Sequence, residues 1–443
     1  MAGEDVPRPS SGDHRPSSGN SAAAATGGKL VVLKVGTSSL YNQELSCVNI
    51  NNLSRITEAV KQLHRMGHSV IVVTSGAVGI GCHRMKIGKK PQVLAKKQAL
   101  AAIGQVHLMR YYEDFFEALD MKCAQVLVTL DNLADRSQYL NVRNTFQELL
   151  NYGAVPIVNE NDTVAVQELR FGDNDTLSAH VAALVKADWL FLMTDVDALY
   201  TANPKSDPNA QPIYEVHDMA KLQADTTTAG TQWGTGGMAT KLTAGRIAIA
   251  AGTTMVICNA AHPENIPKIL AGAEKLGTKF YPIKNVAQGR KRWILSVPVR
   301  GQVWMDVGAV KAVKDRRKSL FCPGITKVVG SFHLSDGVAL CDATGAEFAR
   351  GLSNFASDEL SRIVKGRVWE KSRSGRTVDS VALGYNAVEE VVHRDNITLL
   401  ASREEGHSDD DDEAHAAMAK LVISGRGAAE AEAAAAAAPA AAR

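Results

Sequence analysis

Four short apolar runs of this chain lead into residues that could bind an anion or a charged ligand. The segments at their ends are Gly36-Thr37-Ser38, Ser75-Gly76-Ala77, Asn159-Glu160-Asn161-Asp162 and Thr194-Asp195. Glycine lets the backbone approach a ligand, and hydroxyl, amide and carboxylate groups supply hydrogen bonds. Any one segment could be an ordinary strand-to-helix turn. Because open α/β sheets bind ligands at the carboxyl ends of their parallel strands, we expect all four to form one site.

A glycine-rich loop, Gly234 to Lys241, is a further candidate for anion binding. Its letters fit a dinucleotide fingerprint, but that fingerprint needs a preceding strand, and residues 225–233 are polar and threonine-rich. The Walker pattern also fails, because Leu242 follows the lysine. What remains is a loop that delivers Lys241 into the first turn of a helix. Backbone amides, helix dipole and ammonium there would favour a polyphosphate, and an ordinary surface lysine is the alternative.

The type of reaction follows from the residues that are present and from the motifs that are missing. We find no H-R-D kinase loop, no H-E-x-x-H and no serine-hydrolase elbow. A hydroxyl acceptor would need a base, whereas a carboxylate with a pKa of about 4.3 is already ionised at neutral pH. Joining two anions then requires positive charge. We expect Lys34 and Lys241 to supply it, Asp175 to fix them, and Mg²⁺ to be carried mainly by the phosphates.

The apolar runs alternate with stretches of helical spacing as far as about residue 280. The predicted strands are Leu30–Val35, Val70–Thr74, Ala124–Leu130, Ala154–Val158, Trp189–Thr194 and Thr254–Cys258. The predicted helices cover 50–66, 94–119, 137–151, 175–187 and 238–251. This alternation predicts a three-layer αβα sandwich around a mostly parallel sheet. The β-prone segments Gln302–Met305, Lys327–Val329 and Val338–Cys341 predict a small β-rich domain after it.

Composition limits the class of protein and its organisation. The net charge of +2 over 443 residues gives no reason to expect nucleic-acid binding. Six scattered cysteines without C-x-x-C spacing do not form a zinc motif and are typical of a reducing, cytoplasmic environment. No apolar run could span a bilayer, and no secretory signal is recognisable. We expect disordered tails at 1–27 and 404–443, a catalytic domain at 28–285, a linker at 286–300 and the β-rich domain at 301–403.

Six motifs, taken in order, resemble those of the glutamate 5-kinases in the amino-acid kinase family. They are Lys34-Val-Gly-Thr-Ser, Val73-Thr-Ser-Gly-Ala, Val158-Asn-Glu-Asn-Asp, Phe171-Gly-Asp-Asn-Asp, Leu192-Met-Thr-Asp and Gly234-Thr-Gly-Gly-Met-Ala-Thr-Lys. The resemblance covers about residues 28–400. It implies ATP- and Mg²⁺-dependent phosphorylation of the γ-carboxylate of L-glutamate, the first step of proline synthesis. The rival readings are a kinase for aspartate, acetylglutamate or a nucleoside monophosphate, and an RNA-binding protein with a degenerate kinase core.

The resemblance also implies roles for individual residues. Lys34 and Lys241 would stabilise the phosphoryl group, with Asp175 organising them. Asp162 would bind the ammonium group of glutamate, while Ser75 and Asn174 would bind its carboxylates. The residues that would bind ATP are Lys34, Thr194, Asp195, Thr235, Gly236, Gly237, Met238, Ala239, Thr240 and Lys241. No protein residue is expected to be a principal metal ligand.

The C-terminal segment resembles a PUA domain, on Gly301 to Ala309, Gly324-Ile and Asp336-Gly337. Residues 311–318 include five Lys or Arg, but no aromatic residues interleave with them for base stacking. We therefore expect a structural or regulatory domain rather than an RNA-binding one. The family resemblance further implies inhibition by proline, a downstream glutamate-5-phosphate reductase as partner, and a dimer or tetramer.

Overall fold

The computed structural model describes most of the chain between residues 27 and 400. The described residues are 27–42, 47–165, 174–202, 207, 209–219, 222, 237–283, 286–364 and 390–400. The predicted tails therefore lie almost wholly outside the described residues, as do Asp173, Thr235 and Gly236. No helix in the described part is long and apolar enough to cross a membrane.

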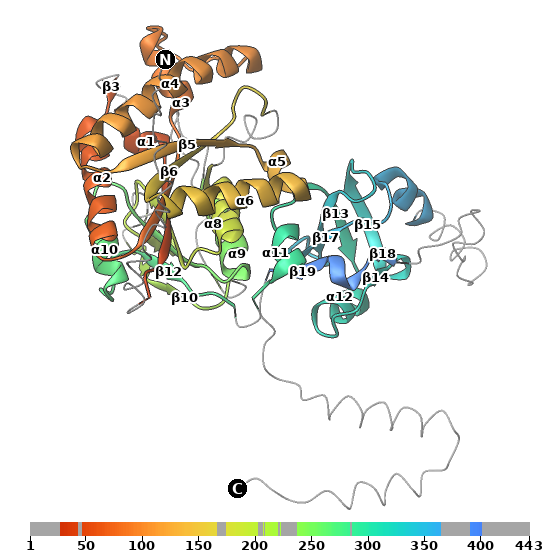
Figure 1. Cartoon of the computed structure of the whole chain (residues 1–443). Helices are drawn as coiled ribbons and strands as arrows, with labels where there is room; N and C mark the ends of the chain where they lie inside the picture. The colour runs from red at the N-terminus through yellow and green to blue at the C-terminus, as the bar shows by residue number, and fades with distance from the viewer. Residues whose placement is uncertain are drawn as a thin grey trace, which may run out of the picture. The chain divides into compact units, whose positions relative to one another are not determined.

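An eight-stranded sheet forms the centre of the part that precedes residue 284, with helices on both faces (Figure 1). Its strand order is β10-β12-β11-β7-β1-β4-β6-β5. The strands are β1 (Leu30–Val35), β4 (Ser69–Thr74), β5 (Lys122–Val128), β6 (Ala154–Glu160), β7 (Trp189–Thr194), β10 (Glu215–Val216), β11 (Thr254–Asn259) and β12 (Thr278–Phe280). All neighbouring pairs are parallel except β11 and β12. The three-layer αβα prediction is confirmed.

Both faces of the sheet are buried, which explains why the strands read as continuous apolar runs. One layer holds α2 (Ile50–Arg65), α3 (Ala77–Arg84), α4 (Leu94–Ala118) and α10 (Asn265–Leu270). The opposite layer holds α6 (Arg136–Asn151), α8 (Asn174–Val185) and α9 (Met238–Ala250). Alternate residues of β1 pack against the two helix layers. Leu33 lies in the core beside α2 and α4, and Val32 lies in the core beside α6, α8 and α9.

The register of the central strands brings the predicted site residues to one edge. Val35 pairs with Thr74 of β4 on one side and with Met193 of β7 on the other. The three strands therefore reach the same level, where Gly36 follows β1, Ser75 follows β4 and Thr194 is the last residue of β7. The expected convergence of these strand ends is confirmed.

One predicted strand ends at the wrong residue. We expected a strand at Ala124–Leu130, but β5 ends at Val128 and α5 (Leu130–Ala134) begins two residues later. The cause is a capping box, in which the Thr129 side chain accepts from the Asn132 amide while the Asn132 side chain accepts from the Thr129 amide. Because this exchange satisfies free amides at the helix start, it favours helix over a longer strand.

The C-terminal part contains a five-stranded sheet of order β15-β13-β16-β17-β19. Its strands are β13 (Val299–Met305), β15 (Ile325–Gly330), β16 (Gly337–Cys341), β17 (Glu347–Leu352) and β19 (Ile397–Leu399). Only the β13–β16 pair is parallel. This sheet has a hydrophobic core of its own, which includes Val303 and Leu340. The predicted β-rich domain is confirmed.

The segment predicted as a linker contains a short helix, α11 (Gly289–Ile294). The Trp293 indole donates to the Ala134 carbonyl at 3.1 Å, and the Thr398 hydroxyl donates to the Lys291 carbonyl at 2.8 Å. The segment is thus held by hydrogen bonds on both sides. The boundaries at 285 and 300 stay predictions.

Candidate active site

Two lysines and one aspartate form a buried ionic cluster at the carboxyl edge of the sheet. Lys34 comes from β1, Asp175 from the first turn of α8, and Lys241 from the first turn of α9. Their ammonium nitrogens lie 2.6 Å and 3.3 Å from the two oxygens of Asp175. The side chain of Asp175 is 1% exposed, and those of the lysines are about one-tenth exposed. The structure therefore brings together the three residues that we predicted for phosphoryl transfer.

The protonation state of this cluster is fixed by competing effects on Asp175. Burial raises the pKa of its carboxyl, but the charges of Lys34 and Lys241, together with their hydrogen bonds, outweigh burial and hold the pKa at about 2. The carboxylate is therefore ionised at neutral pH. With both lysines charged, the cluster has one excess positive charge in a site shielded from water. Such a charge favours an incoming anion strongly.

The first turn of α9 adds a hydroxyl to this arrangement. Gly237 precedes the helix in extended conformation, and Thr240 Oγ1 lies 2.7 Å from the Gly237 carbonyl and 3.2 Å from Asp175 Oδ2. Met238 and Thr240 are half-buried, and Ala239 is exposed. This helix start therefore meets α8 beside the ionic cluster.

Thr194 and Asp195 lie at the end of β7. Thr194 is buried and donates to the Asp195 carboxylate at 3.0 Å, while Asp195 itself is exposed. The Thr194 carbonyl accepts from the Ala260 amide at 2.7 Å, which ties this strand end to the one after β11. Both predicted nucleotide-binding residues thus border the edge that carries the cluster.

A network of neutral side chains lies on the other side of β1. Asn174, the residue before Asp175, donates from Nδ2 to the Thr74 carbonyl at 2.8 Å and to Ser75 Oγ at 2.7 Å. Asn159 Oδ1 lies 3.3 Å from the same nitrogen. Two of the residues predicted for glutamate, Ser75 and Asn174, are therefore in direct contact.

The hydrogen bonds of Asn174 limit what this side chain can offer a ligand, and its role stays a prediction. Its amide nitrogen has two hydrogens, and three acceptors within the protein lie around it: the Thr74 carbonyl, Ser75 Oγ and Asn159 Oδ1. The remaining polar atom is Oδ1, which can only accept a hydrogen bond. In this conformation it could accept from an ammonium group, whereas contact with a carboxylate would require the nitrogen to be released. Ser75 Oγ accepts from Asn174, so its own hydrogen stays available to donate to a carboxylate.

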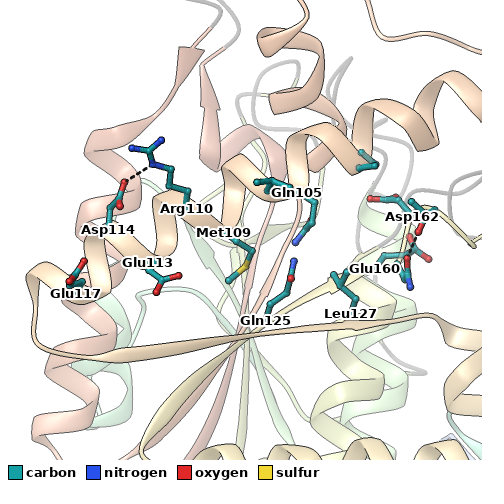
Figure 2. A pocket seen from close by; sticks show the side chains of 15 residues that line it. Gln105, Met109, Arg110, Glu113, Asp114, Glu117, Gln125, Leu127, Glu160 and Asp162 are labelled. Carbon is teal, nitrogen blue, oxygen red and sulfur yellow. Dashed lines mark hydrogen bonds and ion pairs between the residues drawn. The ribbon is translucent and has the colours of Figure 1, made fainter.

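Asp162 follows β6 and lines an open pocket of about 760 Å³ between α4 and β5 (Figure 2). Burial raises the pKa of its carboxyl to about 6, and the charge of Lys90 opposes that rise. Burial in turn lowers the pKa of Lys90. Nothing in the sequence pattern singles out Lys90, because it stands in the polar segment Lys89-Lys90-Pro91 with no motif around it.

Two more polar residues near the site were not predicted as site residues. Gln105 of α4 accepts a hydrogen bond from Asn159 Nδ2 at 2.7 Å, and Tyr112 of the same helix lies 2.9 Å from Thr74 Oγ1. Both residues belong to a long helix whose sequence pattern mainly indicates which residues are buried in the core. A spacing of seven residues on one helix face is the only sequence signal that links them.

Comparison with known proteins agrees with this architecture. Residues 29–259 match the amino acid kinase family, and residues 301–373 match the PUA domain. A glutamate 5-kinase of Acaryochloris marina is 51% identical over 374 residues, which are 83% of this chain and 98% of that protein. One from a Nostoc species is 49% identical over 376 residues, 84% of this chain and 97% of its own length. The solved isopentenyl phosphate kinase of T. acidophilum is 16% identical, with a TM-score of 0.40 over 57% of this chain and 99% of that one.

These alignments, near 50% identical overall, cover more than four fifths of the chain, so the similarity is not confined to residues 29–259. The chain therefore belongs to the glutamate 5-kinases of the amino acid kinase family, with a PUA domain at its C-terminal side.

Proposed function

We propose that this protein transfers the γ-phosphoryl group of ATP to the γ-carboxylate of L-glutamate. The products are ADP and γ-glutamyl phosphate, and the reaction is the first step of proline synthesis from glutamate. The observation that carries the proposal is that two adjacent residues, Asn174 and Asp175, join an ionic part of the site to a neutral part. Asp175 holds Lys34 and Lys241, while Asn174, next to it, holds Ser75.

The chemistry needs no protein base. An oxygen of the ionised γ-carboxylate attacks the γ-phosphorus, and the bond from that phosphorus to the β–γ bridging oxygen breaks. No proton moves in this step, since glutamate enters as the carboxylate and ADP leaves as an anion. Asp175 is not a base, because both of its oxygens are paired with ammonium groups. Its role is to hold the lysines in place.

The obstacle to this reaction is repulsion between two anions, and the buried cations reduce it. Lys34 and Lys241 would contact the transferring phosphoryl group and its leaving oxygen. Because they are already fixed by Asp175, little reorganisation is needed when charge shifts during transfer. The excess positive charge of the cluster is the specific device that we assign to catalysis.

ATP would lie along the start of α9 and the end of β7. The residues that we assign to it are Lys34, Thr194, Asp195 and the loop Thr235 to Lys241. Mg²⁺ fits this site as an ion carried by the phosphates, since the lysines occupy the Asp175 carboxylate. When bound, the ion would supply further neutralisation of phosphate charge.

Glutamate would lie against Ser75, Asn174 and Asp162. The hydroxyl of Ser75 would donate to a carboxylate, while Asn174 Oδ1 and the Asp162 carboxylate would accept from the ammonium group. These contacts orient the γ-carboxylate towards the lysines. Orientation of this kind accounts for a large share of rate enhancement when two substrates must meet.

Family membership supports several wider proposals. We propose a cytoplasmic enzyme that is inhibited by proline, forms a dimer or tetramer, and passes its labile acyl phosphate to a glutamate-5-phosphate reductase. The PUA domain would act in structure or regulation and not in RNA binding. A tight gel shift with RNA at physiological salt would contradict the last statement.

The test of the main proposal uses the purified full-length protein with ATP, Mg²⁺ and hydroxylamine. Hydroxylamine traps an acyl phosphate as a hydroxamate, so γ-glutamyl hydroxamate should accumulate with L-glutamate. L-aspartate and N-acetyl-L-glutamate should give little product, and ADP release with UMP as acceptor should stay at background. Equal turnover with any of these acceptors would reject glutamate as the specific substrate.

A further inference from the structure

Helix α4 contributes polar contacts to the ends of two neighbouring strands. Gln105 Oε1 accepts from Asn159 Nδ2 at 2.7 Å, next to the end of β6. Tyr112 Oη lies 2.9 Å from Thr74 Oγ1, at the end of β4. The two helix residues are seven positions apart and therefore lie on the same face. One helix thus supports both strands whose ends border the proposed glutamate site.

The orientation of each amide in this network is fixed by a backbone atom. The Glu160 amide donates to Asn159 Oδ1 at 2.9 Å, and a backbone N–H can only donate. Asn159 must therefore turn its Nδ2 towards Gln105, and Gln105 must offer its oxygen in return. On the other side, Asn174 Nδ2 faces the Thr74 carbonyl, which can only accept. The donors and acceptors are thus determined without ambiguity between the nitrogen and oxygen of each amide.

These fixed directions extend to the groups that would meet glutamate. Asn159 Oδ1 lies 3.3 Å from Asn174 Nδ2, so it helps to hold that nitrogen towards the protein. With its nitrogen engaged, Asn174 can offer a ligand only Oδ1, as an acceptor, and Ser75 can still donate its own hydrogen. A reversed Asn159 amide would place a donor against the Asn174 nitrogen and break this arrangement.

The position of α4 is itself closely defined. A Cβ atom at Gly104, the residue before Gln105, would lie 1.8 Å from the Ala77 carbonyl oxygen in α3. A Cβ at Gly81 of α3 would lie 1.9 Å from the Leu100 oxygen in α4. The two helices therefore touch backbone to backbone. This contact keeps the Gln105 side chain at a constant distance from the strand ends.

We infer that Gln105 is a positioning residue for glutamate: by accepting a hydrogen bond from Asn159 Nδ2, it helps to hold the Asn159 amide in the orientation that the Glu160 amide requires. This inference rests on the proposed glutamate kinase activity. Gln105 acts through Asn159 and Asn174, and it stabilises substrate binding more than the transfer step. Its substitution should therefore change the KM for glutamate and not kcat.

The first test replaces Gln105 by Met, which keeps the length of the side chain but removes the acceptor. We expect the KM for glutamate to rise about tenfold, with kcat and the KM for ATP within twofold of wild type. Gln105→Glu keeps an acceptor oxygen and should restore most of the affinity. Gln105→Asn withdraws the acceptor by one methylene and should behave like Gln105→Met, which provides a second variant if the first does not fold.

The matched control is Gln125→Met, on β5. Gln125 and Gln105 point towards each other across the same pocket (Figure 2), but in the described part of the chain it is Gln105 that accepts from Asn159 Nδ2. Replacement of Gln125 should therefore leave the KM for glutamate unchanged.

A double-mutant cycle with Asn159→Ala shows whether Gln105 acts through Asn159. We expect the double variant to match Asn159→Ala alone, because that substitution already removes the hydrogen bonds through which Gln105 acts. Additive losses would overturn the inference, as would an unchanged KM in Gln105→Met or an equal loss in Gln105→Glu. If the wild-type protein makes no γ-glutamyl hydroxamate at all, the proposed function fails instead, which is a distinguishable result.

Discussion

The two halves of the candidate site, on either side of β1, are built from different kinds of interaction. The phosphoryl half consists of ionised groups, with Lys34 and Lys241 held by one buried carboxylate. The glutamate half is mainly neutral, with amides and hydroxyls whose donors and acceptors are fixed by backbone atoms. The first half supplies charge for the transition state, and the second supplies directional recognition of the ground state. Substitutions in the two halves should therefore affect different kinetic constants.

The largest effect is expected for Lys241→Ala in the phosphoryl half. Without this ammonium, charge on the leaving oxygen is poorly compensated, so kcat should fall by about 10³-fold or more. The measurement is the rate of hydroxamate formation at saturating glutamate and ATP. Lys268→Ala is the matched control, because Lys268 is an exposed lysine on α10, away from the ionic cluster. A loss below tenfold would contradict the catalytic role of Lys241.

Asp175→Asn should have the next largest effect, and it should change stability as well as activity. The substitution leaves two ammonium groups close together with no opposing charge. We expect kcat to fall by about 100-fold and the free energy of unfolding by about 3 kcal/mol, as measured by activity and chemical denaturation. Asp188→Asn is the control, because its side chain accepts from the Leu30 amide at the opposite end of β1. Full activity in Asp175→Asn would show that the lysines need no organising carboxylate.

Ser75→Ala tests the neutral half. The variant loses a donor to a substrate carboxylate, and charge-assisted hydrogen bonds of this type contribute about 1.5–3 kcal/mol. The KM for glutamate should rise roughly 30-fold, while kcat and the KM for ATP should change by less than threefold. Initial rates over a matrix of both substrate concentrations provide all three values. A fall in kcat with unchanged KM would place Ser75 in the phosphoryl half instead.

The pH dependence of glutamate binding should be the smallest of these effects. Burial raises the pKa of the Asp162 carboxyl to about 6, so this group becomes protonated as the pH falls below that value. The protonated form cannot pair with an ammonium group. The KM for glutamate should therefore rise up to about tenfold from pH 7 to pH 5, whereas the γ-carboxylate of glutamate stays mostly ionised. In Asp162→Asn this pH dependence should disappear, and its persistence would assign the titration to another group.

Much of the phosphoryl half could be predicted from the sequence. Apolar runs identify the parallel strands, and parallel strands of similar length end at one edge. That rule places Lys34 and Thr194 near each other, with Ser75 of the glutamate half beside them, as the register of β1 with β4 and β7 confirms. The glycine loop before α9 and the acidic first turn of α8 then indicate Lys241 and Asp175. The roles of these residues stay predictions.

The glutamate half could be predicted only in part. Ser75, Asp162 and Asn174 belong to sequence motifs, but the direction of each hydrogen bond depends on neighbours that are far away in the chain. Gln105 lies 54 positions before Asn159. The spacing of apolar residues along its helix indicates which side is buried, but not which polar group Gln105 contacts. Lys90 acts on Asp162 across a similar separation. Sequence periodicity identifies the faces of elements, whereas the contacts between polar groups of different elements require the folded structure.

The central claim is that charge for phosphoryl transfer and recognition of glutamate reside in separate halves. Calorimetric titration of L-glutamate, without nucleotide, into Lys241→Ala and Ser75→Ala proteins tests it most directly. The account predicts a Kd within twofold of wild type for Lys241→Ala and roughly 30-fold weaker binding for Ser75→Ala. Equal weakening in both variants would contradict the claim, because it would show that the two halves bind glutamate as one unit.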